Sequence, residues 1–136
     1  TYNTVEEEKE FSIGPFSITA YRMEHECICY GYLIRSRCGS LFYSSDTVFS
    51  ETIATKIPHV DMMLVECSIY DRFGSGKPFG HMNGKETAEF LSIASPEKSL
   101  LVHLPCYGDS SDLLLMVKEH YGGDVSIAEP GRIYTI

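Results

Sequence analysis

Three short segments each place an ionisable side chain beside an apolar run that is typical of a buried strand. The segments read S-S-D-T at 44–47, G-H-M-N at 80–83 and L-V-H-L-P at 101–105, and their ionisable residues are Asp46, His81 and His103. An ionised Asp and a neutral His are both ligands for first-row metals. The pattern therefore predicts a metal site at a shared edge of a sheet, with too few ligands to complete it.

Each of these residues also has an ordinary structural explanation. Asp46 could cap a following helix, His103 could be a core histidine with satisfied hydrogen bonds, and His81 could be an exposed loop residue. Glu66, at the end of the apolar run 60–65, is a fourth candidate, because its carboxylate could fix the tautomer of the His81 imidazole and raise its basicity. It could equally form an ordinary ion pair. His25 lies between two glutamates, and its role stays open.

Length, composition and charge limit the class of protein. The 136 residues suit a single domain, and 43% apolar and 22% charged residues are a globular composition. The net charge of −8 disfavours a general nucleic-acid surface, although it leaves a local basic pocket open. Five cysteines without a regular spacing suit a reducing compartment. No apolar run approaches the roughly 18 residues of a membrane span, and we expect a cytoplasmic protein without a membrane partner.

The elements that must position these residues follow from the apolar periodicity. Residues 11–44 predict a meander: a hairpin around Gly14-Pro15, a strand to about Met23, and strands over 29–34 and 40–44. Three helices are expected, the first between Ser50 and Pro58, the second after the Asn83 and Glu86 capping box, and the third capped by Ser110 or Ser111. Buried strands are expected over 60–65 and 100–104, and a final hairpin over 125–128 and 132–136.

This order predicts an α+β fold, in which a mixed sheet has about three helices mainly on one face. The other face then needs a cover. A sheet this apolar pairs with another sheet in the intact protein or finds one by self-association.

Taken together and in this order, residues 11–136 resemble the C-terminal half of the metallo-β-lactamase superfamily, and are most similar to its ribonuclease Z-like and phosphodiesterase-like branches. The family's strand-Gly-Asp-Thr element matches residues 41–47, with Ser45 in place of Gly. Its apolar strand ending in Thr-His matches residues 100–103, and its Leu-Pro-x-Tyr-Gly-Asp continuation matches 104–109. The resemblance implies that Asp46 bridges two metals and that His103 binds the second one.

The ribonuclease Z-like branch has a Glu-Ala-Thr strand end and a His-Met-Ser helix start, which match residues 66–68 and 81–83 in altered form. The resemblance implies that Glu66 and His81 form a proton relay at the leaving group. The implied cofactor is a pair of Zn²⁺ ions, with Mn²⁺ as an alternative. The family's His-x-His-x-Asp-His cluster occurs nowhere in the 136 residues. We therefore expect residues 1–136 to be a single domain or half-domain whose N-terminal half is absent. Asp46 and His103 alone cannot bind zinc tightly, which leaves open whether this fragment by itself holds any metal.

Two functional hypotheses remain. The first is a metal-dependent hydrolase of a small-molecule or phosphodiester substrate, incomplete in this chain and inactive alone, with nucleic acid left open as a substrate. The second is a catalytically silent fragment that binds no metal and forms a homodimer through its open sheet face. The missing N-terminal half or a second copy would cover that face.

Overall fold

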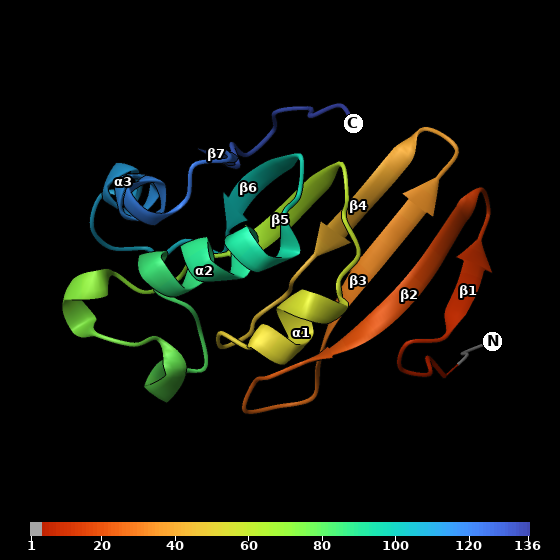
Figure 1. The fold of residues 1–136 in the computed structure, drawn as a ribbon, viewed down its shortest axis with the longest axis horizontal. Coiled ribbons are helices and arrows are strands. Elements are labelled where there is room, and N and C mark those ends of the chain that lie inside the picture. The colour runs from red at the N-terminus through yellow and green to blue at the C-terminus, as the bar shows by residue number, and fades with distance from the viewer. Residues whose placement is uncertain (1–3) are drawn as a thin grey trace.

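A computed structural model describes residues 4–136 and contains a seven-stranded sheet whose strand order follows the chain, β1-β2-β3-β4-β5-β6-β7 (Figure 1). The strands from β1 to β4 pair antiparallel, and those from β4 to β7 pair parallel. Their bounds are β1 Glu10–Ile13, β2 Phe16–Met23, β3 Cys29–Ser36, β4 Gly39–Tyr43, β5 Met62–Glu66, β6 Lys98–Val102 and β7 Asp124–Ile127. The predicted meander and mixed sheet are confirmed.

Three α-helices connect the parallel strands: α1 Glu51–Lys56, α2 Gly84–Ala94 and α3 Ser110–His120. Two short 3₁₀ turns, η1 Asp71–Phe73 and η2 Lys77–Phe79, lie in the long loop after β5. The predicted capping box of α2 is present, because Asn83 accepts from the Glu86 N–H and Glu86 accepts from the Asn83 N–H. No helix within residues 4–136 combines the length and the apolar character needed to cross a bilayer.

The caps of the other two helices differ from the prediction. Asp109, and neither predicted serine, caps α3, since its Oδ1 accepts from the N–H of Ser111 at 2.9 Å. Ser50 occupies the N-cap position of α1, but its hydroxyl donates to Glu24 Oε1 at 2.6 Å. A neighbouring carboxylate competes here with the helix N–H groups for the serine hydroxyl.

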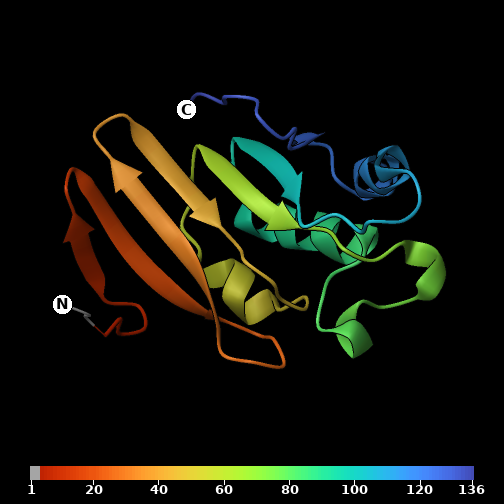
Figure 2. The same cartoon turned by 180° about the vertical axis from the view of Figure 1, so that it is seen from behind.

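Helices α1 and α2 cover one face of the sheet, and α3 lies beside the β6–β7 edge (Figures 1 and 2). Phe42, Met63 and Leu101 point from the sheet into this layer, where they pack with Phe90 and Leu91 of α2. All five side chains are fully buried. Burial of large apolar side chains at roughly 1.5–3 kcal/mol each makes this layer the main core of the fold. The predicted α+β class, with helices mainly on one face, is confirmed.

The opposite face is open over the antiparallel part of the sheet. Leu33 pairs with Phe42 on the helix side, so the next residue, Ile34, points to the other side, together with its partner Ile18. Both line a cavity of about 640 Å³, along with Phe11 and other residues of the N-terminal segment. This apolar face has no helix over it within the described residues (Figure 2).

The predicted final hairpin is wrong, because residues 132–136 form no strand. The turn at 130–131 is present. After it, the Tyr134 hydroxyl accepts a hydrogen bond from the Glu129 N–H at 2.9 Å and lies 3.4 Å from the Ile127 carbonyl oxygen. A side chain thus occupies the groups that a paired strand would use. The tail continues past β6 and β5 and brings Ile136 against Gly39 at the start of β4.

Candidate metal centre

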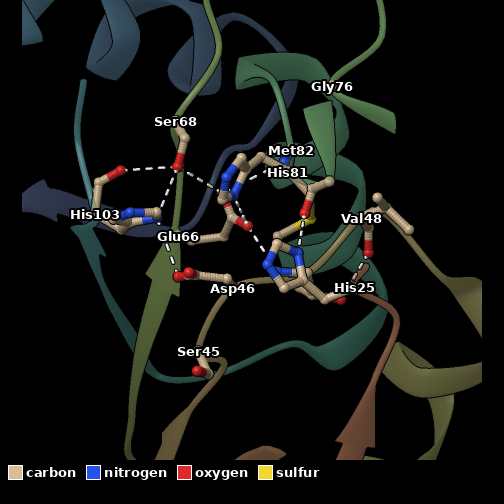
Figure 3. Close-up of polar contacts among 12 residues, drawn as sticks. His25, Ser45, Asp46, Val48, Glu66, Ser68, Gly76, His81, Met82 and His103 are labelled. Atoms are coloured by element: carbon tan, nitrogen blue, oxygen red, sulfur yellow. Dashed lines mark hydrogen bonds and ion pairs between the residues drawn. The ribbon is translucent and has the colours of Figure 1, made fainter. Parts of the chain in front are cut away.

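The carboxyl ends of three neighbouring parallel strands bring the candidate residues together (Figure 3). Asp46 follows β4, Glu66 ends β5 and His103 follows β6 directly, while His81 lies three residues before α2. Each of the four offers one ligand atom, and these atoms lie within 4.8 Å of one another. The edge beyond the carboxyl ends of parallel strands is where open α/β sheets bind ligands. All four residues singled out in the sequence therefore share one site, while their individual roles stay predictions.

The backbone is strained at two positions of this edge. Ser45 has φ 55° and His103 has φ 51°, a left-handed region that residues other than Gly rarely adopt. Such conformations cost on the order of 1–3 kcal/mol each and cluster at functional sites. The family motif has a glycine at the position of Ser45. This chain therefore makes the sharp turn with a serine, whose Cβ makes a positive φ unfavourable. Both turns aim a candidate ligand across the sheet edge.

Asp46 and His103 face each other directly. Asp46 Oδ1 lies 3.1 Å from His103 Nδ1, and their side chains are 35% and 48% exposed. This ion pair is the only contact of the Asp46 carboxylate among the hydrogen bonds and ion pairs of residues 4–136. The alternative that Asp46 caps the following helix is wrong, because α1 begins at Glu51 and Ser50 occupies its N-cap position. A carboxylate oxygen and an imidazole nitrogen are thus accessible to a shared ion.

Glu66 has a different environment, because its carboxylate is buried and fully engaged. Its side chain is 1% exposed. Oε1 accepts from the Thr47 N–H at 2.7 Å, and Oε2 accepts from the Ser68 hydroxyl at 2.7 Å and lies 3.4 Å from Met82 N. Buried carboxylates of this kind are stabilised by charge-assisted hydrogen bonds. Glu66 therefore holds the strand ends and the helix start in register, and leaves little room for a metal on its oxygens.

His81 is oriented by Glu66. Its Nδ1 lies 2.9 Å from Glu66 Oε1, and because an ionised carboxylate only accepts, Nδ1 carries the hydrogen. The opposite nitrogen, Nε2, then has no protein partner within the described residues, and it is the atom that can give or take a proton. The His81 ring centroid lies 5.0 Å from that of His103. A proton-transfer group is thus held beside the candidate metal ligands.

Sequence reasoning missed one residue of the site, Ser68, and left the role of a second, His25, open. Ser68 Oγ lies 2.7 Å from Glu66 Oε2 and 3.1 Å from His103 Nδ1, so this hydroxyl connects the two strand ends. Its position two residues after Glu66 was the signal, because residues i and i+2 leave a strand on the same side. The second residue, His25, lies in the loop between β2 and β3, where periodicity carries no such signal.

The His25 ring, in the loop between β2 and β3, packs against the His81 ring. Its Nδ1 lies 2.8 Å from the Gly80 carbonyl oxygen, so Nδ1 is the donor and Nε2 is left with a free lone pair. The His25 and His81 ring centroids are 5.4 Å apart. A Cβ on Gly80, whose φ is 77°, would lie 2.9 Å from His25 Nδ1. Gly80 therefore permits this close approach of the loop to the site.

Cys67, between Glu66 and Ser68, takes no part in this chemistry. Burial raises the pKa of its thiol to about 12, and the side chain is fully buried in the core. A thiol binds metals and reacts as the thiolate, so Cys67 is inert at neutral pH. The accessible carboxylate of Asp46 and the imidazoles of His81 and His103 are donors that suit a first-row metal.

The fold and the strand-end residues define the class, and the chain belongs to the metallo-β-lactamase superfamily. Residues 1–104 match the family described as "Beta-lactamase superfamily domain". Its resemblance to this superfamily, recognised from the motifs, is confirmed.

Among individual proteins, the chain is similar to "Probable metallo-hydrolase YhfI" of Bacillus subtilis (strain 168), with 28% identity over 128 residues. The crystal structure of that protein superposes with a TM-score of 0.88 at 27% identity, covering 95% of this chain and 53% of the other. Human tRNase Z, short form, has a TM-score of 0.65 at 17% identity. That match covers 88% of this chain and 41% of the tRNase Z chain. Igni18, a metallo hydrolase from the archaeon Ignicoccus hospitalis, has a TM-score of 0.74 at 13% identity. That match covers 97% of this chain and 59% of Igni18.

The chain thus spans about half the length of the proteins that it resembles. The two more distant structures share the fold alone. The assignment of residues 1–136 as a half-domain with its N-terminal half absent stays a prediction.

Proposed function

We propose that this chain belongs to a metal-dependent phosphodiester hydrolase and supplies the part of its site that binds one side of a dinuclear centre and protonates the leaving group. The observation that carries the proposal is the convergence of Asp46, His81 and His103, with Glu66 behind them, at one sheet edge within 4.8 Å. A similar protein is named as a probable metallo-hydrolase.

The metal would be held by Asp46 and His103, whose ligand atoms lie within 4.8 Å of each other. When bound, such ions lower the pKa of a coordinated water and polarise the phosphoryl oxygen. We favour Zn²⁺, with Mn²⁺ as the alternative. Two ligands from this chain leave coordination sites for groups from elsewhere, in line with an expected N-terminal half.

The acid–base work falls to His81. With Nδ1–H fixed on Glu66 Oε1, Nε2 can carry a proton toward the site and deliver it to the departing oxygen. Glu66 stabilises the imidazolium that this requires, because its buried negative charge lies 2.9 Å away. Solvent can replace the proton that His81 gives to the leaving oxygen, since the His81 side chain is 20% exposed.

A phosphodiester substrate is supported by two observations. The Glu66 and His81 pair occupies the positions of the proton relay in the branch that the motifs resemble, and a protein of similar fold is named as a tRNase. The net charge of −8 disfavours a long RNA substrate and favours a small diester.

The direct test is hydrolysis of bis(4-nitrophenyl) phosphate by the protein in its natural length, with Zn²⁺ or Mn²⁺ added. We expect activity that falls by more than about a hundredfold in Asp46→Ala and in His103→Ala. His59→Ala is the matched control, because His59 is an exposed histidine that pairs only with the surface residue Glu97 and the Ser95 carbonyl. Activity that survives both site substitutions would contradict the proposal.

A second candidate function, a silent domain that self-associates, is supported by the open sheet face. Its cavity of about 640 Å³ is lined by apolar residues of four neighbouring strands, including Phe11, Ile18 and Ile34. A homodimer through this face would bury apolar area on the scale of an obligate interface. Light scattering after size exclusion decides: a stable monomer contradicts this candidate, whereas a metal-free dimer without hydrolase activity favours it over the enzyme.

A further inference from the structure

A small aromatic pocket adjoins the candidate metal centre, formed by the loop after β5 and the loop after β6. Its cavity measures about 150 Å³ and is lined by Ile69, Phe73, Phe79 and Tyr107. We call these four residues the aromatic pocket. None of its side chains takes part in the metal centre or the Glu66 and His81 pair, so the proposed chemistry leaves the pocket without a role.

The aromatic pocket is joined to the catalytic groups through the chain. Phe79 lies two residues before His81, and Tyr107 lies four residues after His103. Consecutive Cα atoms are 3.8 Å apart, so the Phe79 and His81 Cα atoms are at most about 8 Å apart. One wall of the pocket therefore begins within two residues of the group that we propose as the proton donor to the leaving group.

The rings of the aromatic pocket are unusually exposed for their size. Phe73 is 51%, Phe79 is 54% and Tyr107 is 49% exposed. The Phe73 and Tyr107 ring centroids lie 6.4 Å apart at an interplanar angle of 76°, an edge-to-face arrangement. Apolar rings that gather around a concave site, and that are not buried in the core, are a feature of ligand-binding pockets.

The walls of the aromatic pocket are held in place before any ligand binds. Tyr70, which is fully buried, donates from its hydroxyl to the Tyr107 carbonyl oxygen at 3.0 Å. On the other side, Asn83 Nδ2 donates to the carbonyl oxygen of Gly74, next to Phe73, at 2.8 Å. The Arg72 guanidinium lies 5.0 Å from the Phe73 ring centroid. Fixed walls lower the entropic cost of binding a ligand.

We propose that the aromatic pocket binds a planar aromatic ring on the leaving group of the substrate, which makes the enzyme selective for aryl-type over alkyl-type esters. The inference rests on the proposed function, because it places the ring relative to the proton of His81. A cavity of about 150 Å³ is the size that holds a single benzene-like ring. Edge-to-face contact with the pocket's rings then adds about 0.5–1.5 kcal/mol beyond simple burial, a two- to twelvefold gain in affinity.

The test measures binding separately from catalysis, by calorimetric titration of the natural-length, Zn²⁺-loaded protein with three phosphonates. Phenylphosphonate is expected to bind about tenfold more tightly than methylphosphonate, and about threefold more tightly than cyclohexylphosphonate, which has similar bulk without a π-face. In Phe79→Leu, which keeps an apolar side chain, the phenyl and cyclohexyl affinities should become equal. Phe16→Leu is the matched control, since Phe16 is 45% exposed on the distant β1–β2 hairpin and should keep the wild-type ratio.

The outcomes separate the two proposals. Equal affinities for phenyl- and cyclohexylphosphonate in the wild type, or a ratio unchanged by Phe79→Leu, would overturn the aromatic pocket even if bis(4-nitrophenyl) phosphate is hydrolysed. A ring preference that depends on Phe79, in a protein that hydrolyses no diester, would support the pocket and contradict the proposed function alone. Thermal unfolding of each variant shows that it is folded when titrated.

Discussion

Glu66 Oε1 lies 2.9 Å from His81 Nδ1, and the same oxygen accepts the backbone N–H of Thr47, the residue after Asp46. One buried carboxylate thus fixes both the tautomer of the candidate acid and the position of the candidate bridging ligand. This link between β5, the segment after β4 and the start of α2 makes the proton relay and the metal site a single structural unit.

Replacement of Glu66 by Gln should disrupt this unit, although the two side chains have nearly the same volume. Glu66 Oε1 accepts from the Thr47 N–H and Oε2 lies 3.4 Å from Met82 N, so the amide nitrogen of Gln would face a backbone N–H whichever way it points. We expect a loss of about 1–3 kcal/mol in the free energy of unfolding and a 10–100-fold loss in hydrolysis rate. Urea unfolding and steady-state kinetics measure the two effects.

The control for this substitution is Glu97→Gln, because Glu97 is an exposed carboxylate paired with a histidine, His59. It should leave stability and rate near the wild-type values. If Glu66→Gln behaved like Glu97→Gln, the carboxylate would have no organising role.

Substitution of Gly80 by Ala should displace His25 and, with it, the neighbouring His81. The new Cβ would lie 2.9 Å from His25 Nδ1, and φ at this position is 77°. Gly131→Ala is the matched control, since Gly131 has φ 81° but nothing within 4 Å of the new Cβ. Both variants should lose about 1–2 kcal/mol of stability from backbone strain. Only Gly80→Ala should also weaken hydrolysis, through the displaced His81; equal effects in both variants would contradict the close packing of His25.

Chemical labelling should separate Cys67 from the other cysteines. All five are free, and Cys67 alone is buried, with a thiol pKa raised to about 12 by that burial. A raised pKa keeps the thiol protonated through pH 8, where alkylation needs the thiolate. Iodoacetamide at pH 8 should therefore modify Cys67 only after urea unfolding, as read by peptide mass spectrometry. Rapid modification of Cys67 in the folded protein would show that the strand end is open to solvent.

The sequence allowed the mixed sheet with its leading meander, the helix positions and the four converging residues to be predicted, because these depend on local periodicity and on strand ends. Asp46, Glu66 and His103 each follow an apolar run, and the carboxyl ends of parallel strands meet at one edge. The Asn83 and Glu86 capping box is a local motif and was predicted for the same reason.

Contacts between segments far apart in sequence were not predictable. His25 reaches the Gly80 carbonyl across 55 residues, and no periodicity in the loop from 24 to 28 indicates it. The expected strand at 132–136 failed for a related reason, because the Tyr134 side chain competes for backbone groups in a way that apolar alternation does not reveal. The true cap of α3, Asp109, stands one residue before the predicted serines, within the usual uncertainty of helix boundaries.

The most direct test of the account is the metal content of the natural-length protein, measured by plasma mass spectrometry after equilibration with Zn²⁺ and buffer exchange, alongside Asp46→Asn, His103→Ala and the control His59→Ala. We predict stoichiometric zinc in the wild type and in His59→Ala, and a loss of at least one ion per chain in each site variant. Equal zinc in all four proteins, or none in the wild type, would contradict a metal centre built on Asp46 and His103.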